Sequence, residues 1–189
     1  MREAQRNPAV IHYRVEGNLR AIDVSVDHIS QLFSGLDPSP FGQKDLDGDV
    51  HSYIIAAVEE IGGPEKVKLL IHFPAEELPL AADLPTAFHN FFAYRAWANT
   101  RDLHRLLRIG YASLAIGLLF LAICLLLQHA IPDRPTNALY SILSEGLVIV
   151  GWVALWRPLE IFLYEWWPIW RRKRLHLALT RIPVECRVR

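Results

Sequence analysis

The longest apolar stretch of the chain lies between residues 109 and 132 and contains no charged side chain. A helix of about 20 residues crosses a hydrocarbon core about 30 Å thick, and this stretch is long enough. Backbone groups in lipid must bond within their own segment, so the stretch is expected to be helical. Because the rest of the chain is too short to surround a helix that is apolar on every side, we interpret residues 109–131 as a first transmembrane helix.

A second apolar stretch, residues 138–170, is less uniform. Glu145 interrupts it near its start, and Arg157, Glu160 and Glu165 interrupt it near its end. A charge at the centre of a bilayer costs at least about 2.5 kcal/mol on insertion scales. The positions of these charges therefore decide where a second span can end.

Two divisions of this stretch are consistent with the pattern. In the first, the span covers residues 139–157, and Pro158 opens a separate amphipathic helix, residues 158–170, along the membrane interface. In the second, a tilted helix continues from about Leu147 to Trp167 and carries an arginine and a glutamate paired three residues apart. We favour the first division because it keeps the charges away from the bilayer centre.

Polar groups near membrane depth generally face protein or water. Those of the second stretch are therefore candidates for docking against the first span or against a second copy of the chain. The docking candidates are Glu145, Arg157, Glu160 and Tyr164. Tryptophans near the end of the stretch are typical of an interfacial belt. The expected anchors are Trp156, Trp166, Trp167 and Trp170.

Basic residues flank the two spans at their outer ends. They are Arg95, Arg101, Arg105 and Arg108 before the first span, and Arg171, Arg172, Lys173 and Arg174 after the second. The connecting loop, residues 132–138, offers only Arg134 beside Asp133. The positive-inside bias therefore predicts that both termini are cytoplasmic and that the loop is periplasmic. The basic tail, residues 171–189, also suits binding to anionic lipid.

The pattern before the first span predicts a β-hairpin over residues 9–26, with a turn at Gly17-Asn18. The alternating apolar positions are Ile11, Tyr13, Val15, Ile22, Val24 and Val26. A two-residue loop pairs positions whose numbers sum to 35, which sets Tyr13 opposite Ile22 and Ile11 opposite Val24. The apolar side chains then share one face, and this agreement supports the register.

Three further elements complete the expected fold. Apolar positions at helical spacing predict a helix over residues 47–61, ended by the Gly-Gly-Pro that follows. Residues 67–73 are expected to form a central strand, and a long helix is expected to enter the membrane over residues 85–131. The sequence thus predicts an α+β cytoplasmic module of ββαβα order, residues 1–90, fused to an α-helical transmembrane hairpin.

The net charge of the chain is zero, but acidic and basic residues are concentrated in different parts of it. Residues 1–90 carry 7 basic and 14 acidic side chains, whereas residues 171–189 carry 7 basic and one acidic. This distribution excludes a uniformly basic nucleic-acid-binding protein and an acidic disordered chain. Two cysteines, Cys124 and Cys186, cannot form a disulfide scaffold, so reduced thiols are expected.

Motifs that carry chemistry are sparse. One acidic run contains Asp45, Asp47, Gly48 and Asp49. Its glycine occupies position four, whereas a calcium loop requires it at position six, so we interpret the acids as helix N-terminal residues that complement the helix dipole. The eight histidines show no zinc-ligand spacing, and no metal or cofactor is expected. His12 is expected to face Asp23 across the hairpin as a surface pair.

Four sequence blocks resemble a family of small bacterial membrane proteins of uncharacterised function. The blocks are LDPSPF (36–41), KDLD (44–47), HNFFAYRA (89–96) and GWVALWRPLEIFLYEWWPI (151–169). The resemblance implies a bacterial inner-membrane setting, and it marks the polar block around Arg157-Pro158-Leu159-Glu160 as the family's hallmark. It carries over no catalytic residue.

The leading hypothesis is a non-enzymatic integral inner-membrane protein that acts as a scaffold, an accessory subunit or a sensor. Its expected partners are membrane lipid and a second copy or a larger membrane complex, not nucleic acid. The first alternative is an oligomeric channel or transporter subunit in which Glu145, Arg157 and Glu160 line a path between protomers. The second is a small membrane enzyme that acts on lipid at the cytoplasmic interface, using His or Asp groups near residues 45–51 and 89–104.

Overall fold

The computed structural model describes residues 13–130 and 138–189, which divide into two units. The first unit is built from two segments of the chain, one up to Ala96 and one from Arg174 onward. The second unit holds the residues between them, Trp97–Lys173. The chain therefore leaves the first unit once and returns to it.

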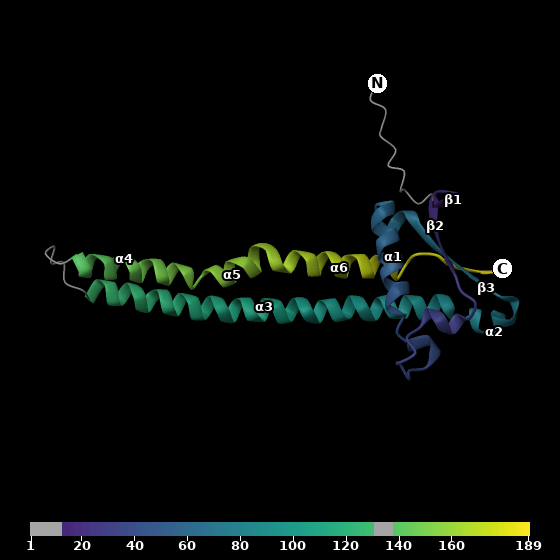
Figure 1. Ribbon diagram of the computed structural model, residues 1–189, viewed down its shortest axis with the longest axis horizontal. Helices are drawn as coiled ribbons and strands as arrows, with labels where there is room; N and C mark the ends of the chain where they lie inside the picture. The colour runs from purple at the N-terminus through teal and green to yellow at the C-terminus, as the bar shows by residue number, and fades with distance from the viewer. Residues whose placement is uncertain (1–12, 131–137) are drawn as a thin grey trace, which may run out of the picture. The chain divides into compact units, whose positions relative to one another are not determined.

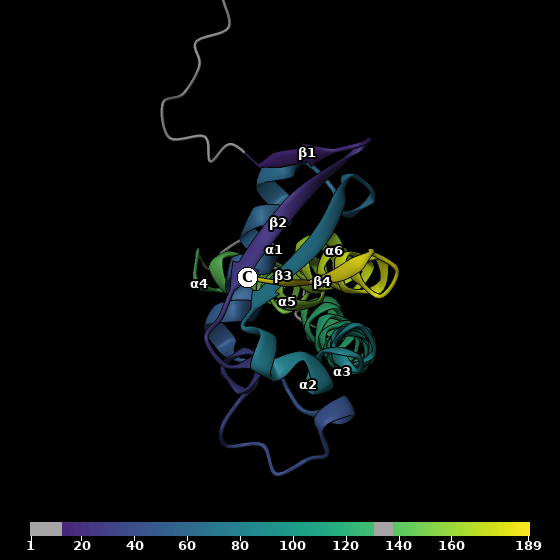
Figure 2. The same ribbon diagram turned by 90° about the vertical axis from the view of Figure 1, so that its right-hand side faces the viewer.

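The first unit contains one mixed sheet of four strands (Figure 2). The strands are β1 (Arg14–Glu16), β2 (Leu19–Ser25), β3 (Val67–Phe73) and β4 (Val184–Val188), and they are neighbours in this order. β1 is antiparallel to β2, whereas β3 is parallel to both β2 and β4. A parallel pair cannot be joined by a tight turn, so each of these pairs needs a crossover connection.

The predicted register of the hairpin is confirmed for the residues that pair. Arg14 lies opposite Ala21, and Glu16 lies opposite Leu19, so the paired numbers sum to 35 as expected. Gly17 adopts a φ of 66° in the turn, a conformation that glycine reaches without steric cost. Ile11, which was expected to face Val24, lies outside the described residues.

The fourth strand corrects the expected fold. The sequence analysis treated residues 171–189 as a basic tail, but they continue a helix and then form β4 beside β3. Val184 lies opposite Leu69, and Cys186 lies opposite Ile71, so the apolar positions of β4 extend the apolar face of β3. The module is therefore a mixed four-stranded sheet with helices, and its last strand comes after both apolar stretches.

Helices cover one face of the sheet, behind the strands in Figure 2. They are α1 (Gly48–Ile61), α2 (Leu78–Ala81) and the first turns of α3 (Leu84–Ala130), with 3₁₀ turns at Ile29–Leu32, Phe41–Gln43, Pro64–Lys66 and Ala75–Glu77. The buried core joins Ile22, Leu69 and Ile71 of the sheet to Ile54 and Val58 of α1 and to Phe88 and Phe92 of α3. Burial of such side chains contributes roughly 1.5–3 kcal/mol each relative to exposure.

The limits of α1 agree with the sequence analysis. The Asp47 carboxylate accepts a hydrogen bond from the backbone N–H of Asp49 at 2.9 Å, which satisfies one of the free donors at the helix start. Gly62 ends the helix in the left-handed conformation with a φ of 93°. The acidic run is thus a helix start, as interpreted.

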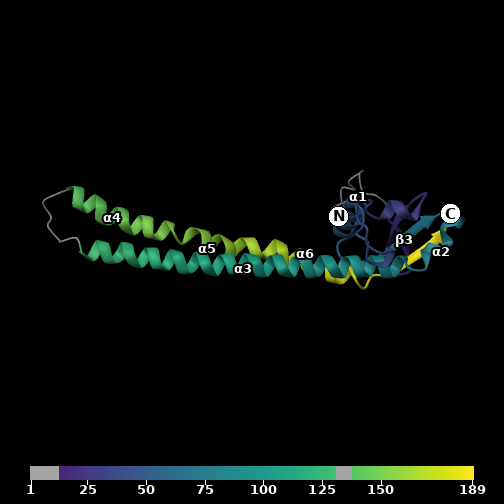
Figure 3. The same ribbon diagram turned by 90° about the horizontal axis from the view of Figure 1, so that it is seen from below.

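The second unit consists of two helical paths that lie side by side (Figures 1 and 3). The first is α3, whose 47 residues confirm the prediction of one long unbroken helix. The second is α4 (Ala138–Val153), α5 (Trp156–Glu160), a π turn (Ile161–Glu165) and α6 (Trp166–Leu179). The expected periplasmic loop, residues 132–138, lies outside the described residues except for Ala138, which begins α4.

Both paths are long and apolar enough to cross a membrane. The candidate spans are Leu84–His129 and Ser144–Leu179, and only 17% of the most apolar window of each is buried. The expected amphipathic helix over residues 158–170 is not a separate element, because the helical path continues to Leu179. A short irregularity at residues 154–155, between α4 and α5, is the break that Pro158 causes.

Close contact between the two paths depends on small residues. Pro158 has no N–H, so it cannot donate the usual helical hydrogen bond to the carbonyl of Ala154. A Cβ atom at Gly117 of α3 would lie 2.9 Å from this carbonyl oxygen and 2.9 Å from Cδ2 of Leu155. Gly117 therefore lets α3 approach the second path at the point where its helix is interrupted.

We expect Gly117→Val to destabilise the second unit by about 1–3 kcal/mol, the usual cost of inserting atoms into a well-packed contact. Gly146→Val is the matched control, because a Cβ at Gly146 of α4 meets no atom within 4 Å. Both free energies of unfolding can be measured by titration with a denaturing detergent in mixed micelles. Equal effects of the two substitutions would contradict the close contact at Gly117.

Candidate functional site

The second unit contains a polar cluster that we name the Arg157 cluster, made of Trp156, Arg157, Glu160 and Glu165. Arg157 donates from Nη1 to Glu160 Oε2 at 3.3 Å. It also donates from both terminal nitrogens to the two carboxylate oxygens of Glu165, with Nη2 and Oε2 separated by 3.2 Å. The indole Nε1 of Trp156 donates to Glu160 Oε1 at 3.2 Å. The predicted pair of Arg157 with Glu160 is thus present, and Glu165 adds a bidentate contact.

The π turn explains why Glu165 joins this cluster. Arg157 and Glu165 are eight residues apart, which does not place two side chains on one face of a regular α-helix. A π turn contains about one residue more than an α turn. One α turn followed by one π turn therefore spans about eight residues, and this brings Arg157 and Glu165 to the same face. Sequence reasoning missed this contact because nothing in the residue pattern marks the π turn.

The cluster is not covered by the rest of the second unit. The Arg157 side chain is 54% exposed, and Tyr164, which precedes Glu165 in the sequence, is 70% exposed. Leu159 and Leu163 are exposed around them. Glu145 is exposed in α4 and is not part of this cluster. The described residues thus present a polar group with both signs of charge within an apolar surface.

Three of the expected tryptophan anchors contact one another. The ring centroids of Trp166, Trp167 and Trp170 are 5.2–6.3 Å apart. Trp166 also donates from Nε1 to the carbonyl oxygen of Phe162 in the π turn at 2.8 Å. The basic residues Arg171, Arg172, Lys173 and Arg174 follow directly in α6. Aromatic rings next to basic side chains are the combination that membrane interfaces favour.

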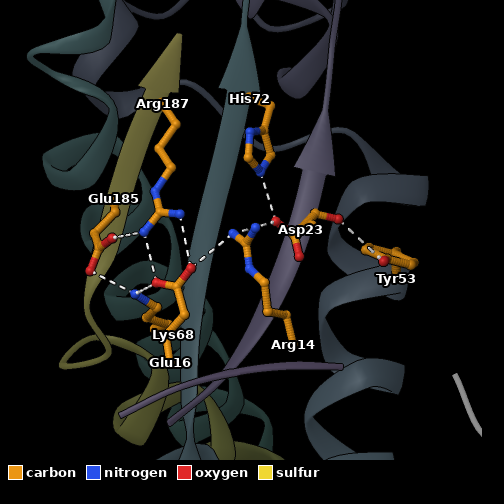
Figure 4. A network of polar contacts seen from close by, with 8 residues as sticks. All are labelled: Arg14, Glu16, Asp23, Tyr53, Lys68, His72, Glu185 and Arg187. Atoms are coloured by element: carbon orange, nitrogen blue, oxygen red, sulfur yellow. Dashed lines mark hydrogen bonds and ion pairs between the residues drawn. The ribbon is translucent and has the colours of Figure 1, made fainter. Parts of the chain in front are cut away.

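The first unit carries a second polar group, which we name the sheet-face network (Figure 4). It contains Arg14, Glu16, Asp23, Lys68, His72, Glu185 and Arg187, which come from all four strands. Figure 4 shows these side chains in front of the sheet, on the face opposite the helices. The network therefore occupies the face that the hydrophobic core leaves open.

Lys68 is the centre of the sheet-face network and is only 6% exposed. Its Nζ contacts Glu16 and lies 3.0 Å from Glu185 Oε1. Glu16 also accepts from the two terminal nitrogens of Arg187, at 2.9 and 2.7 Å. Two acids and two bases thus neutralise one another, and they connect β1, β3 and β4.

The pKa values of these groups reflect the same contacts. Hydrogen bonds from Arg187 and Lys68 lower the pKa of the Glu16 carboxyl to about 2. A hydrogen bond from Lys68 lowers the pKa of Glu185, and the hydrogen bond to Glu16 raises that of Lys68. All of these groups are therefore charged near neutral pH, which suits a structural connection between strands rather than proton transfer.

Asp23 has a partner that was not predicted from the sequence. Its Oδ1 lies 2.7 Å from Nε2 of His72 on the neighbouring strand β3. Tyr53 of α1 donates its hydroxyl to the backbone carbonyl of Asp23 at 3.3 Å. His12, the expected partner, lies outside the described residues. The sequence analysis could not find His72 because the pairing of β2 with β3 is not local.

A cavity of about 510 Å³ lies in the first unit between the loop that follows the 3₁₀ turn at Ile29–Leu32 and the start of α3. Its lining residues are Asp37, Ser39, Gln43, Asp45, Asn90, Phe91 and Tyr94. All of these residues except Gln43 come from three of the blocks on which the expected family resemblance rests. The fold thus brings together blocks that are far apart in the sequence.

Most of the polar atoms that line this cavity hold the loop in place. Asp37 accepts from the backbone N–H groups of Ser39 and Asp45, at 2.9 and 2.7 Å. These hydrogen bonds, together with one from the Ser39 side chain, lower the pKa of Asp37. Asn90 donates to the carbonyl oxygen of Gly42 at 2.9 Å. The Asp37 carboxylate is therefore a loop-forming group, and the cavity is half polar and half apolar.

Within residues 13–130 and 138–189, no three His, Cys, Asp or Glu side chains lie close enough together to hold a metal ion. The cysteines Cys124 and Cys186 are both free thiols. No protein-family model, no curated protein and no solved structure matches the chain. The features of the molecule that bear on its function are therefore the two polar groups, the cavity and the apolar helices.

We expect Lys68→Met to destabilise the first unit, because it leaves Glu16 and Glu185 without the cation between them. Lys66→Met is the matched control, since Lys66 is exposed in a 3₁₀ turn two residues earlier. Thermal unfolding of the two purified variants gives the comparison. An unchanged midpoint for Lys68→Met would show that the network does not hold the strands together.

Proposed function

We propose that the chain is an integral membrane protein whose two apolar helices anchor an α+β module on the cytoplasmic side. In this proposal it has no catalytic role, and it acts as a scaffold, an accessory subunit or a sensor in a bacterial inner membrane. The pairing of β4 with β3 is the observation that carries the proposal.

The sheet constrains how the chain can cross a membrane. β3 precedes α3, and β4 follows α6, yet the two strands are hydrogen-bonded neighbours. The segment between them must return to the side from which it left, so it crosses a bilayer an even number of times. Two candidate spans satisfy this requirement as a hairpin.

The surface of the second unit supports insertion into lipid. Large side chains such as Ile116, Leu126 and Ile149 are 69%, 70% and 63% exposed. The core helix of a water-soluble protein would bury such residues, whereas lipid solvates them without cost. Arginines in the first half of the first candidate span and near the end of the second favour the cytoplasm for the α+β module.

The Arg157 cluster supports self-association. Charged side chains that are exposed between apolar ones are costly in lipid and are generally covered by protein. In a two-fold symmetric pair, Arg157 of one copy can approach the excess carboxylate of the other, because each cluster carries one base and two acids. A second copy is therefore the partner that this surface fits best.

We expect a reporter that is active only in the cytoplasm to work when it is fused to either end of the chain in a bacterial host. A reporter that is active only outside the cytoplasm should work when it is inserted between residues 131 and 137. The reason is the even number of crossings that the β3–β4 pairing requires. A C-terminal fusion that is active only outside the cytoplasm would contradict both the hairpin and the sheet.

We expect Glu160→Gln to weaken self-association at least tenfold, about 1.4 kcal/mol, because it removes the excess negative charge of the Arg157 cluster. Glu59→Gln is the control, because Glu59 is exposed in α1 of the other unit. Molar mass in detergent, measured over a range of protein concentrations, reports the dissociation constant. A native chain that remains monomeric at every concentration would contradict self-association, whereas the hairpin would be unaffected by that result.

A further inference from the structure

Two histidines meet inside the first unit, on helices that are far apart in sequence. Nε2 of His51 in α1 lies 3.3 Å from Nε2 of His176 in α6. His176 is only 7% exposed, and its ring stacks on Phe92 with 6.0 Å between the centroids. The ring of His51 contacts the edge of Phe91 at 5.5 Å. The histidine pair therefore packs against the core, with His176 buried and His51 partly buried.

A third basic group faces the pair from α3. The guanidinium carbon of Arg95 lies 5.1 Å from the centroid of the Phe91 ring, which also contacts His51. The Nε atom of Arg95 is buried and has no hydrogen-bond partner among the described residues. Burial and the charge of Arg95 lower the pKa of His51. The groups that face His51 are thus His176 from α6 and Arg95 from α3.

The contact between the two ring nitrogens depends on the number of protons that the pair holds. A hydrogen bond between two imidazoles needs one nitrogen that carries a proton and one that does not. When both rings are protonated, each nitrogen is a donor, and two positive charges lie 3.3 Å apart beside Arg95. The neutral and singly protonated states can keep the contact, and the doubly protonated state cannot.

The other histidine contacts in the described residues respond differently to acid. His28 lies 3.0 Å from a carboxylate oxygen of Glu77, and His72 lies 2.7 Å from one of Asp23. His89 lies 3.0 Å from the carbonyl oxygen of Ile182. A protonated ring keeps all three contacts, because carboxylates and carbonyls are acceptors. Of these four contacts, the His51–His176 contact is the one that is opposed by protonation of the rings, because two protonated rings offer no acceptor.

We propose that the His51–His176 pair is a proton-sensitive connection, through which acidification of the cytoplasm releases the end of α6 and strand β4 from the α+β module. α6 leads directly into β4, and the turn between them packs in the same core through Leu179 and Ile182. Loss of the histidine contact therefore acts on the segment that closes the sheet. The connection would give the anchored module a way to respond to pH.

The direction of the pH dependence follows from proton linkage. His51 binds a proton less readily in the folded chain than in the unfolded chain, so the unfolded state holds more protons at low pH. The contribution of His51 to stability is complete above a pH of about 6.5, the ordinary pKa of histidine. It decreases as the pH falls below that value.

Hydrogen exchange of the full chain in detergent tests the proposal. At pH 5.5, the backbone amides of residues 176–188 should exchange at least tenfold faster than at pH 7.5, after correction for the intrinsic effect of pH on exchange. The amides of β2 should change less, because β2 pairs with β1 and β3 and not with β4. Equal corrected rates for residues 176–188 at the two pH values would overturn the proposal, and this comparison needs no variant.

Two variants test whether the acid-induced increase in exchange comes from the histidine pair or from a general effect of acid. His51→Phe keeps an aromatic ring against Phe91 and Phe92 but cannot be protonated, so it should abolish the acid-induced increase. His89→Gln is the matched control, because His89 contacts the same C-terminal segment through a carbonyl and should leave the increase in place. A chain with His51→Phe that still shows the tenfold increase would assign the response to another group and overturn the proposal.

Discussion

The parallel pairing of β3 with β4 is the constraint on which the rest of the molecule depends. It closes the sheet with a strand that follows both apolar helices, so these helices form an insertion within a single crossover connection. Lys68 adds to the backbone pairing, because it joins Glu16 and Glu185 across the open face of the sheet (Figure 4). The two apolar helical paths are therefore an insertion between two neighbouring strands of the sheet rather than a segment added after it.

A glycine in one long helical path lies against the point where a proline interrupts the other path. Pro158 interrupts the second path, and the carbonyl of Ala154 that it leaves without a helical donor lies against Gly117 of α3. The π turn that follows brings Glu165 onto the face of Arg157. Irregular backbone thus accompanies both the close contact at Gly117 and the Arg157 cluster.

Local patterns predicted the hairpin, α1, β3 and α3, whereas contacts between distant segments were not predictable. The hairpin register follows from a two-residue turn, and the length of α3 follows from its composition. Strand β4 was missed because the basic residues of the tail obscured the alternation of Val184, Cys186 and Val188. The cavity and the sheet-face network were missed for another reason, since each collects side chains from segments that only the folded chain brings together.

Strand β4 is also the last element of the fold to be synthesised. Translation produces β1, β2 and β3 first, then both apolar helices, and β4 only afterwards. Until then β3 presents an unpaired edge, which is a known site of aggregation and of recognition by other chains. In the proposed membrane arrangement, a chain whose helices insert incorrectly would leave β4 on the far side of the bilayer and the edge of β3 unpaired. Completion of the sheet would then depend on correct insertion of both helices.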